Sequence, residues 1–175
     1  GIELSGQGAI GGTEGAFRYI YKRGFGDFEV ATRVTTISAA NGEAGMMIRQ
    51  NEGDDAPFFG VSLAQTGSGT AVKSFHRSQR GADAIVDGAV GALSGPVWLK
   101  AARVGNEFRA YYAQDVDGSP GEWLLIPGST QHLAMDKGVL YGLTANGPGG
   151  AEQHPAVFGG FAFTAGSAVY ADAFD

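Results

Sequence analysis

The sequence predicts an all-β fold in which two antiparallel sheets pack as a jelly-roll sandwich. Three observations lead to this prediction. Helical periodicity is almost absent, and apolar residues alternate with polar ones over short runs. Gly, Asn, Asp or Pro separates these runs, and the 30 glycines follow no regular period, which suits many tight turns. The apolar fraction of 43% and the charged fraction of 17% are typical of a globular protein.

The predicted strands follow one another along the chain with no helix between them. Residues 28–37 are rich in Val and Thr, which favour strands. Gly105-Asn106 separates two further runs and is typical of the two-residue turn of a hairpin. We expect residues 1–175 to form one β-sandwich domain that is a module of a larger protein. The predicted strands span residues 17–22, 28–37, 44–50, 58–64, 71–77, 97–104, 107–113, 123–126, 139–146 and 156–165.

Alternation along a strand divides its side chains between two faces of the sheet. We expect an inward face with these residues: Met46, Ile48, Phe59, Val61, Leu63, Leu99, Ala101, Phe108, Ala110 and Tyr112. We expect the opposite, outward face to carry these residues: Arg49, Ser62, Ser74, His76, Trp98, Lys100, Arg109 and Tyr111.

The outward residues suggest a binding surface if their strands are neighbours. Aromatic rings stack on the apolar face of a sugar, and Arg or His side chains bond its hydroxyl groups. With Trp123 at the rim, the candidate ligand-binding residues are Arg49, His76, Trp98, Lys100, Arg109, Tyr111 and Trp123. The alternative for each aromatic residue is ordinary packing.

Two acidic loops are candidate calcium sites, because calcium prefers several oxygen ligands and these usually come from loops. Asp54 and Asp55 lie in one loop, and Asp115 and Asp117 lie in the other. The second loop lacks the glutamate that closes an EF-hand loop. The alternative is that these acidic residues make turns and keep the surface soluble.

Charge and composition exclude several function classes. The net charge is −6 and no run of Lys or Arg occurs, so we expect no nucleic-acid partner. No apolar run approaches the ~20 residues of a membrane span, so we expect no membrane insertion. The absence of cysteine excludes thiolate nucleophiles and disulfides.

Four motifs in order resemble one known family. They are residues 26–30 (GDFEV), 44–49 (AGMMIR), 96–100 (PVWLK) and 103–112 (RVGNEFRAYY). Their order is similar to that of DUF1349-like domains of the concanavalin A-like lectin/glucanase superfamily, over residues 16–163. The resemblance implies a jelly roll of two curved sheets. It also implies a module of a large exported protein, either secreted or at the cell surface of a bacterium.

The resemblance does not imply catalysis. Catalytic glucanases of this superfamily carry a Glu-x-Asp-x-x-Glu run on one strand, and this chain has no such run. Hydrolysis of a glycoside needs two carboxylates on one face, roughly 5 to 10 Å apart. We therefore expect no enzyme, with a polysaccharide-active hydrolase or lyase as the alternative.

The leading hypothesis from the sequence is a non-catalytic, lectin-like module that binds a saccharide or a cell-surface glycan. One alternative is an adhesin module that binds a protein or peptide ligand in a calcium-dependent way. Another is a spacer domain without a ligand. Calcium is the one cofactor that the sequence suggests.

Overall fold

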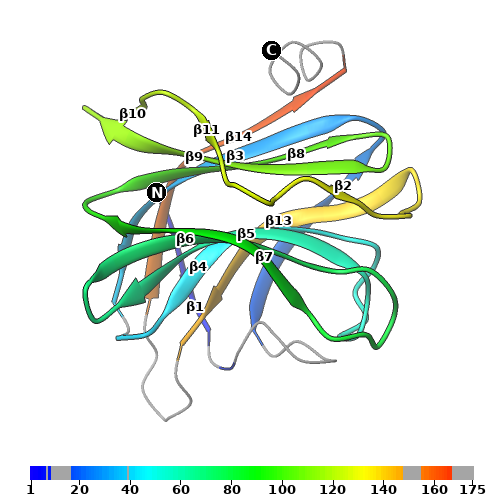
Figure 1. Cartoon of the computed structure of the whole chain (residues 1–175), viewed down its shortest axis with the longest axis horizontal. Helices are drawn as coiled ribbons and strands as arrows, with labels where there is room; N and C mark the ends of the chain where they lie inside the picture. The colour runs from blue at the N-terminus through cyan, green and yellow to red at the C-terminus, as the bar shows by residue number, and fades with distance from the viewer. Residues whose placement is uncertain (7, 9–16, 39, 148–154, 167–175) are drawn as a thin grey trace.

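The computed structural model describes residues 1–6, 8, 17–38, 40–147 and 155–166 as two antiparallel sheets that face each other (Figure 1). The eight-stranded sheet runs in the order β1 (Ile2–Ser5), β14 (Pro155–Ala165), β3 (Phe28–Ile37), β8 (Val97–Val104), β9 (Glu107–Val116) and β10 (Ser119–Pro120). Two short strands, β11 (Leu124–Leu125) and β12 (Gln131–His132), also pair with β9.

The six-stranded sheet runs in the order β2 (Arg18–Phe25), β13 (Gly138–Asn146), β4 (Glu43–Arg49), β5 (Phe58–Thr66), β6 (Gly69–Arg77) and β7 (Ile85–Leu93). Apolar alternation does not predict strand β7, because glycines and alanines interrupt the pattern there. Within the described ranges, no helix is long and apolar enough to cross a membrane.

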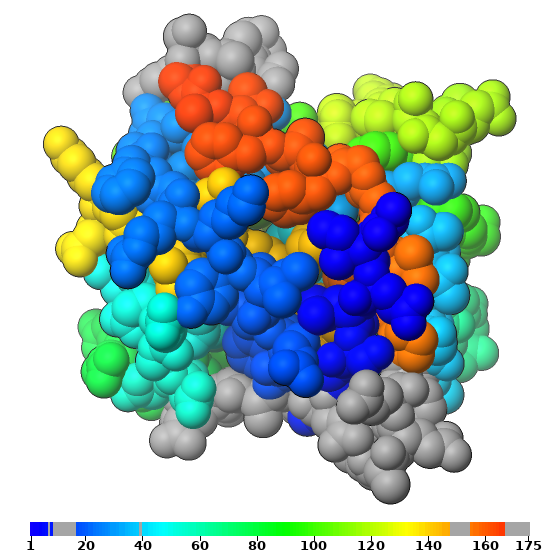
Figure 2. All heavy atoms as spheres, turned by 180° about the vertical axis from the view of Figure 1, so that it is seen from behind, coloured from blue at the N-terminus to red at the C-terminus, as the bar shows by residue number. Residues whose placement is uncertain are grey.

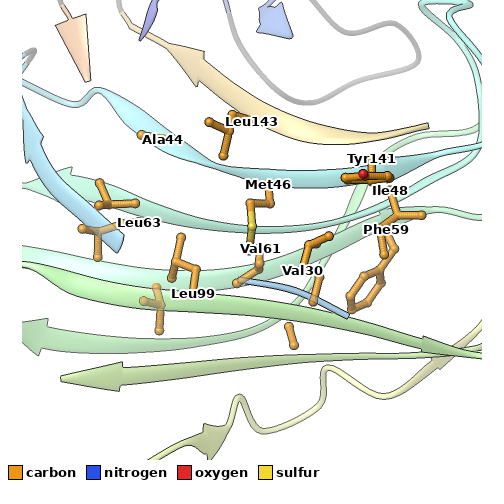
Figure 3. Packing of buried hydrophobic residues seen from close by; sticks show 14 of the residues in the cluster. Val30, Ala44, Met46, Ile48, Phe59, Val61, Leu63, Leu99, Tyr141 and Leu143 are labelled. Atoms are coloured by element: carbon orange, nitrogen blue, oxygen red, sulfur yellow. The ribbon is translucent and has the colours of Figure 1, made fainter. Parts of the chain in front are cut away.

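The core between the sheets confirms the predicted inward face (Figure 3). Every predicted core residue except Tyr112 is buried there, and Tyr112 is partly buried against the same cluster. The predicted hairpin at Gly105-Asn106 is also confirmed, since β8 and β9 pair up to Val104 and Glu107 on either side of it. Gly105 has a φ of 60°, which glycine adopts without strain.

The predicted faces of β6 are wrong. Ser74 pairs with Val61, and His76 pairs with Phe59, so both point inward with these core residues. Phe75 instead points outward and joins Met47 and Phe58 in a second apolar cluster on the outer side of the six-stranded sheet. Both faces of β6 therefore carry apolar residues, and alternation alone does not tell which face is inward.

Candidate functional site

The structure divides the predicted ligand-binding residues between the two sheets. Arg49 lies on the outer face of the six-stranded sheet, and His76 lies on that sheet's inner face. The expectation that one face carries all of these residues is wrong, because β4 and β6 belong to a different sheet from β8 and β9. The remaining candidates stay together on the outer face of the eight-stranded sheet: Trp98, Lys100, Arg109, Tyr111 and Trp123.

The polar groups on that outer face are engaged with one another. The Lys100 ammonium lies 4.4 Å from the centroid of the Trp123 ring and 3.6 Å from a carboxylate oxygen of Glu29. Arg109 contacts Glu107 at 2.6 Å between Nη2 and Oε1. The chain itself therefore supplies an ionic partner for both predicted cations, and Lys100 is buried.

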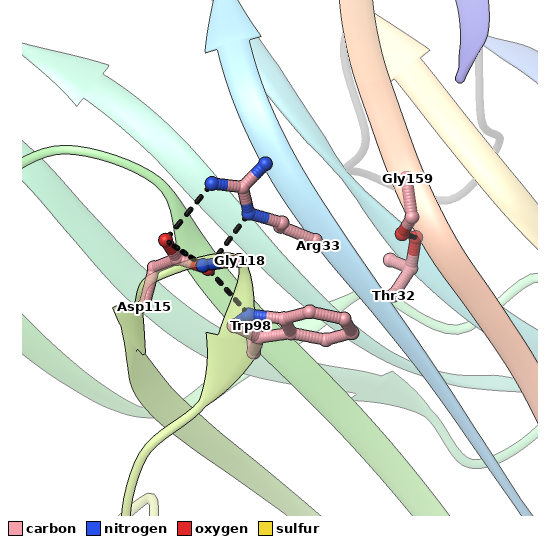
Figure 4. Close-up of polar contacts among 6 residues, drawn as sticks. All are labelled: Thr32, Arg33, Trp98, Asp115, Gly118 and Gly159. Atoms are coloured by element: carbon pink, nitrogen blue, oxygen red, sulfur yellow. Dashed lines mark hydrogen bonds and ion pairs between the residues drawn. The ribbon is translucent and has the colours of Figure 1, made fainter.

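Trp98 is part of the same packed face rather than an open platform (Figure 4). Its side chain is 8% exposed, and its indole Nε1 donates a 2.8 Å hydrogen bond to Oδ1 of Asp115. The ring lies so close to Gly160 that a Cβ at this position would come within 2.4 Å of the ring. The surroundings of Trp98 are those of a structural residue.

Asp115 uses both carboxylate oxygens in protein contacts. Arg33 donates to Oδ1 and Oδ2 at 2.7 and 2.8 Å, and the Gly118 amide donates to Oδ2 at 3.1 Å. The hydrogen bond from Arg33 is the main reason that the pKa of Asp115 falls to about 2. This carboxylate therefore does not fit a calcium ligand, because its acceptor sites are occupied.

The other acidic loop is organised by arginines. Asp54 accepts a hydrogen bond from Arg77 through its backbone carbonyl at 2.9 Å, and the Asp55 carboxylate lies 3.4 Å from the Arg80 guanidinium. Across the described part of the chain, no three His, Asp or Glu side chains gather as a metal site would need. The two candidate calcium loops, one with Asp54 and Asp55 and the other with Asp115 and Asp117, belong to different sheets and are separate from each other.

We expect the Arg33–Asp115 contact to make stability depend on acidic pH. The pKa of Asp115 lies below its ordinary value of 3.8, so its stabilising effect is fully present above pH 3.8 and is lost as pH falls through about 2. Asp115→Asn should lower the midpoint of thermal unfolding at neutral pH, and this difference from the wild type should shrink towards pH 2. A difference that stays constant from neutral pH to pH 2 would contradict this account.

His76 is held inside the sandwich by Asp87. Its Nδ1 lies 2.8 Å from both carboxylate oxygens of Asp87, and both side chains are buried. Burial raises the pKa of Asp87. His76 therefore has a partner from its own chain and does not face the surface on which we expected it.

A polar hollow lined by residues outside the predicted ligand-binding set lies on the outer side of the six-stranded sheet. Its volume is about 440 Å³. It forms where β2, β13 and the loop after β4 meet, because Leu140 in β13 pairs with Arg23 on one side and Arg49 on the other. The lining residues are Arg23, Gln50, Asn51, Glu52, Gly53, Gly138, Val139 and Leu140.

An exposed tyrosine stands beside this polar hollow. Tyr21 and Arg23 share the outward face of β2, and the Tyr21 side chain is 43% exposed. Its hydroxyl group bonds to Glu52, which raises the pKa of Tyr21. The Tyr21 ring stacks on Tyr19 at 5.1 Å between centroids. Tyr19 is fixed in turn by a 3.2 Å hydrogen bond from its hydroxyl to the carbonyl of Met47.

Arg49 supports the polar hollow from beneath. Its side chain is 2% exposed, and its guanidinium lies 5.3 Å from the Phe17 ring centroid and 5.5 Å from that of Phe58. It donates a 2.6 Å hydrogen bond to the carbonyl of Gly53. Burial lowers the pKa of Arg49. We infer that Arg49 positions the loop at residues 50–53.

The two amide side chains in the loop are oriented by their carbonyl oxygens. Oε1 of Gln50 accepts from the Asp136 amide at 3.0 Å, and Oδ1 of Asn51 accepts from the Gly53 amide at 2.8 Å. The NH₂ groups are then the ends that can donate to a ligand.

The sequence signal for this site was the alternation of aromatic and charged residues in 17–22. It was not sufficient, because the pairing of β2 with β13 joins segments far apart in the chain.

Comparisons with known proteins support the fold. A functionally unknown protein from Saccharomyces cerevisiae has a TM-score of 0.69 at 14% identity, over 94% of this chain and 87% of its own. Xylan beta-1,4-xylosidase from Bacillus halodurans C-125 has a TM-score of 0.65 at 16% identity, over 93% of this chain but 32% of its own. The carbohydrate-binding module CBM66 from Bacillus subtilis has a TM-score of 0.56 at 15% identity, over 93% and 95%.

No protein-family description and no curated protein matches the chain. At such low identities the structural likeness shows the fold alone. The predicted jelly-roll β-sandwich is confirmed, and this fold occurs both in a carbohydrate-binding module and in about a third of the xylosidase.

Proposed function

We propose that this domain is a non-catalytic saccharide-binding module, with the polar hollow beside Tyr21 as its binding site. The observation that carries the proposal is the exposed Tyr21 ring next to a hollow lined by Arg23, Gln50, Asn51 and Glu52. The shared fold with a carbohydrate-binding module supports it. The resemblance to DUF1349-like domains supports the same proposal and extends it to a module of an exported bacterial protein.

The chemistry of the polar hollow suits a sugar. A pyranose or furanose ring has an apolar face of C–H groups, which packs on an aromatic ring such as that of Tyr21. Its hydroxyl groups both donate and accept hydrogen bonds, so they match the amide groups of Gln50 and Asn51 and the charged ends of Arg23 and Glu52. The hydrogen bond from Tyr21 to Glu52 holds the ring in place before the ligand arrives.

The residues of this hollow argue against glycoside hydrolysis there. Glu52 is the one carboxylate among its lining residues. Hydrolysis by the usual mechanisms requires a pair of carboxylates on either side of the glycosidic bond. A site with one carboxylate, two amides and an arginine binds hydroxyl groups without supplying an acid and a base together.

A glycan array on the purified domain tests the proposal, and the strongest saccharide hit is then titrated against variants. We expect Arg23→Ala to weaken binding by about tenfold or more, since a hydrogen bond to a charged group contributes about 1.5–3 kcal/mol. Tyr21→Ala removes the ring on which the sugar packs and should also weaken binding. Tyr21→Phe keeps the ring but loses the hydrogen bond to Glu52, so it should bind more weakly than the wild type and more tightly than Tyr21→Ala. Arg109→Ala alters the other sheet and should leave affinity unchanged.

Two results would contradict the proposed site. An array without any binding would contradict the proposal of a saccharide ligand and favour a protein or peptide ligand. Saccharide binding that survives Arg23→Ala and Tyr21→Ala but is lost in Arg109→Ala would move the site to the eight-stranded sheet. The array is run with calcium and with a chelator, and we expect the same hits in both, because the acidic side chains of the two loops are not gathered as a calcium site requires.

A further inference from the structure

An apolar slot opens between the two sheets at the edge formed by β1 and β2. Figure 2 views this edge, with β1 in dark blue, β2 in lighter blue, β14 in orange, and parts of β13 in yellow between them. The slot has a volume of about 290 Å³. Its lining residues are Ile2, Ile20, Tyr21, Lys22, Tyr141, Gly142, Leu143 and Phe161.

Two isoleucine side chains that line the slot point inward but are not covered. Ile20 pairs with Leu143 and Ile2 pairs with Phe158, and both partners belong to the core. Ile2 is nevertheless 42% exposed and Ile20 is 40% exposed. The two sheets therefore do not close over each other at this edge, and an apolar surface is left open to a ligand.

One charged side chain borders the slot. Lys22 follows Ile20 by two residues on the same inward face of β2, and it pairs in register with Tyr141. Among the residues that the structure describes, no carboxylate forms an ion pair with Lys22. The slot therefore combines an apolar wall with one cation, a pattern that complements an amphipathic anion.

A simpler role for Lys22 also has a physical basis. An inward-pointing charge on an edge strand discourages a second molecule from pairing with that edge, and β2 is an edge strand. This role explains the lysine but not the open volume beside it, which is lined by Ile20, Leu143 and Phe161. The two roles make different predictions about ligand binding.

We propose that the slot binds a small amphipathic monocarboxylate. Its aryl or alkyl part lies against Ile20, Leu143 and Phe161, and its carboxylate pairs with the Lys22 ammonium. The volume is near the lower end of the range for small-molecule sites, so a single ring with a short acid chain is of suitable size. Strand β2 then carries two different sites, since Ile20 and Lys22 face the slot while Tyr21 and Arg23 face the outer side.

The test titrates 3-phenylpropanoate and the matched neutral alcohol 3-phenylpropan-1-ol into the domain by calorimetry. We expect the wild type to bind the acid about tenfold more tightly than the alcohol, as one charge-assisted contact would give. Lys22→Gln should weaken the acid about tenfold and leave the alcohol unchanged. Ile20→Ser, at an already half-exposed position, should weaken both. Lys137→Gln, an exposed lysine outside the slot, is the control and should change neither.

Three results would overturn this inference. The first is no saturable binding of 3-phenylpropanoate by the wild type at millimolar concentration. The second is unchanged binding of the acid in Lys22→Gln; if this variant also self-associates on size-exclusion chromatography, Lys22 only protects the edge. The third is loss of acid binding in Arg23→Ala, which would place the ligand in the polar hollow on the other side of β2.

Discussion

Replacement of Trp98 with alanine is expected to lower the free energy of unfolding by about 3–5 kcal/mol, the range for truncating a buried large aromatic residue. The ring is almost fully buried and packs on Gly160, so its loss opens a cavity. The variant also removes the indole donor from Oδ1 of Asp115, which then keeps Arg33 as its main side-chain partner. We expect the main effect of this variant to be the loss of stability, with no direct effect on ligand binding.

Urea denaturation followed by far-UV circular dichroism measures this effect. Trp98→Phe is the matched variant, because it keeps an aromatic ring but lacks the N–H donor. We expect it to cost about 1–3 kcal/mol, less than the alanine variant, since the ring still fills most of the space. If Trp98→Ala retained wild-type stability and lost saccharide binding, Trp98 would be a ligand contact, as the sequence alone suggested.

Gly142→Ala is expected to be strongly destabilising, because the added methyl group would meet the backbone of a neighbouring strand. A Cβ at this position would lie 1.9 Å from the carbonyl oxygen of Ile20 and 2.7 Å from the Cα of Tyr21. Both atoms belong to the backbone of β2, which cannot move away without losing its pairing with β13. We expect a loss of about 3 kcal/mol or more, the upper part of the range for overpacking.

The control for this prediction is Gly91→Ala in β7. A Cβ at Gly91 has no neighbour within 4 Å, so the free energy of unfolding should change by at most about 0.5 kcal/mol. Because β2 also carries Tyr21, Arg23 and Lys22, any Gly142→Ala protein that still folds should bind saccharide and 3-phenylpropanoate more weakly. Equal stability of the two alanine variants would show that β2 can adapt to the added methyl group.

The proposed saccharide site is built from residues that have different structural roles. Arg49 and Arg77 approach the ring of Phe58 from separate strands, at 5.5 and 5.1 Å from its centroid. Arg49 donates a hydrogen bond to the carbonyl of Gly53. Arg77 donates hydrogen bonds to three backbone carbonyls, those of Asp54, Ala56 and Ala82. These buried cations hold the loops, and we propose that the exposed side chains of Tyr21 and Arg23 contact the ligand.

Local patterns in the sequence were enough to predict the class of fold and most of the core. Alternation identified Met46, Ile48, Val61 and Leu99 as inward residues, because the period of a strand is local and each side chain's face follows from its neighbours. Gly105-Asn106 marked a hairpin for the same reason, since a two-residue turn depends on its own backbone angles.

Which outward residues lie close together depends on how distant strands pair. Alternation predicts that Arg49 and Trp98 both face outward, but it does not tell to which sheet each belongs. In the structure, β4 and β8 lie in different sheets. Arg23 and Gln50 came together only because β13 inserts between β2 and β4. Pairing between distant strands depends on packing of the whole sandwich, and no local pattern encodes it. The faces predicted for β8 and β9 were therefore correct, although the predicted binding surface that joined them to β4 and β6 was wrong.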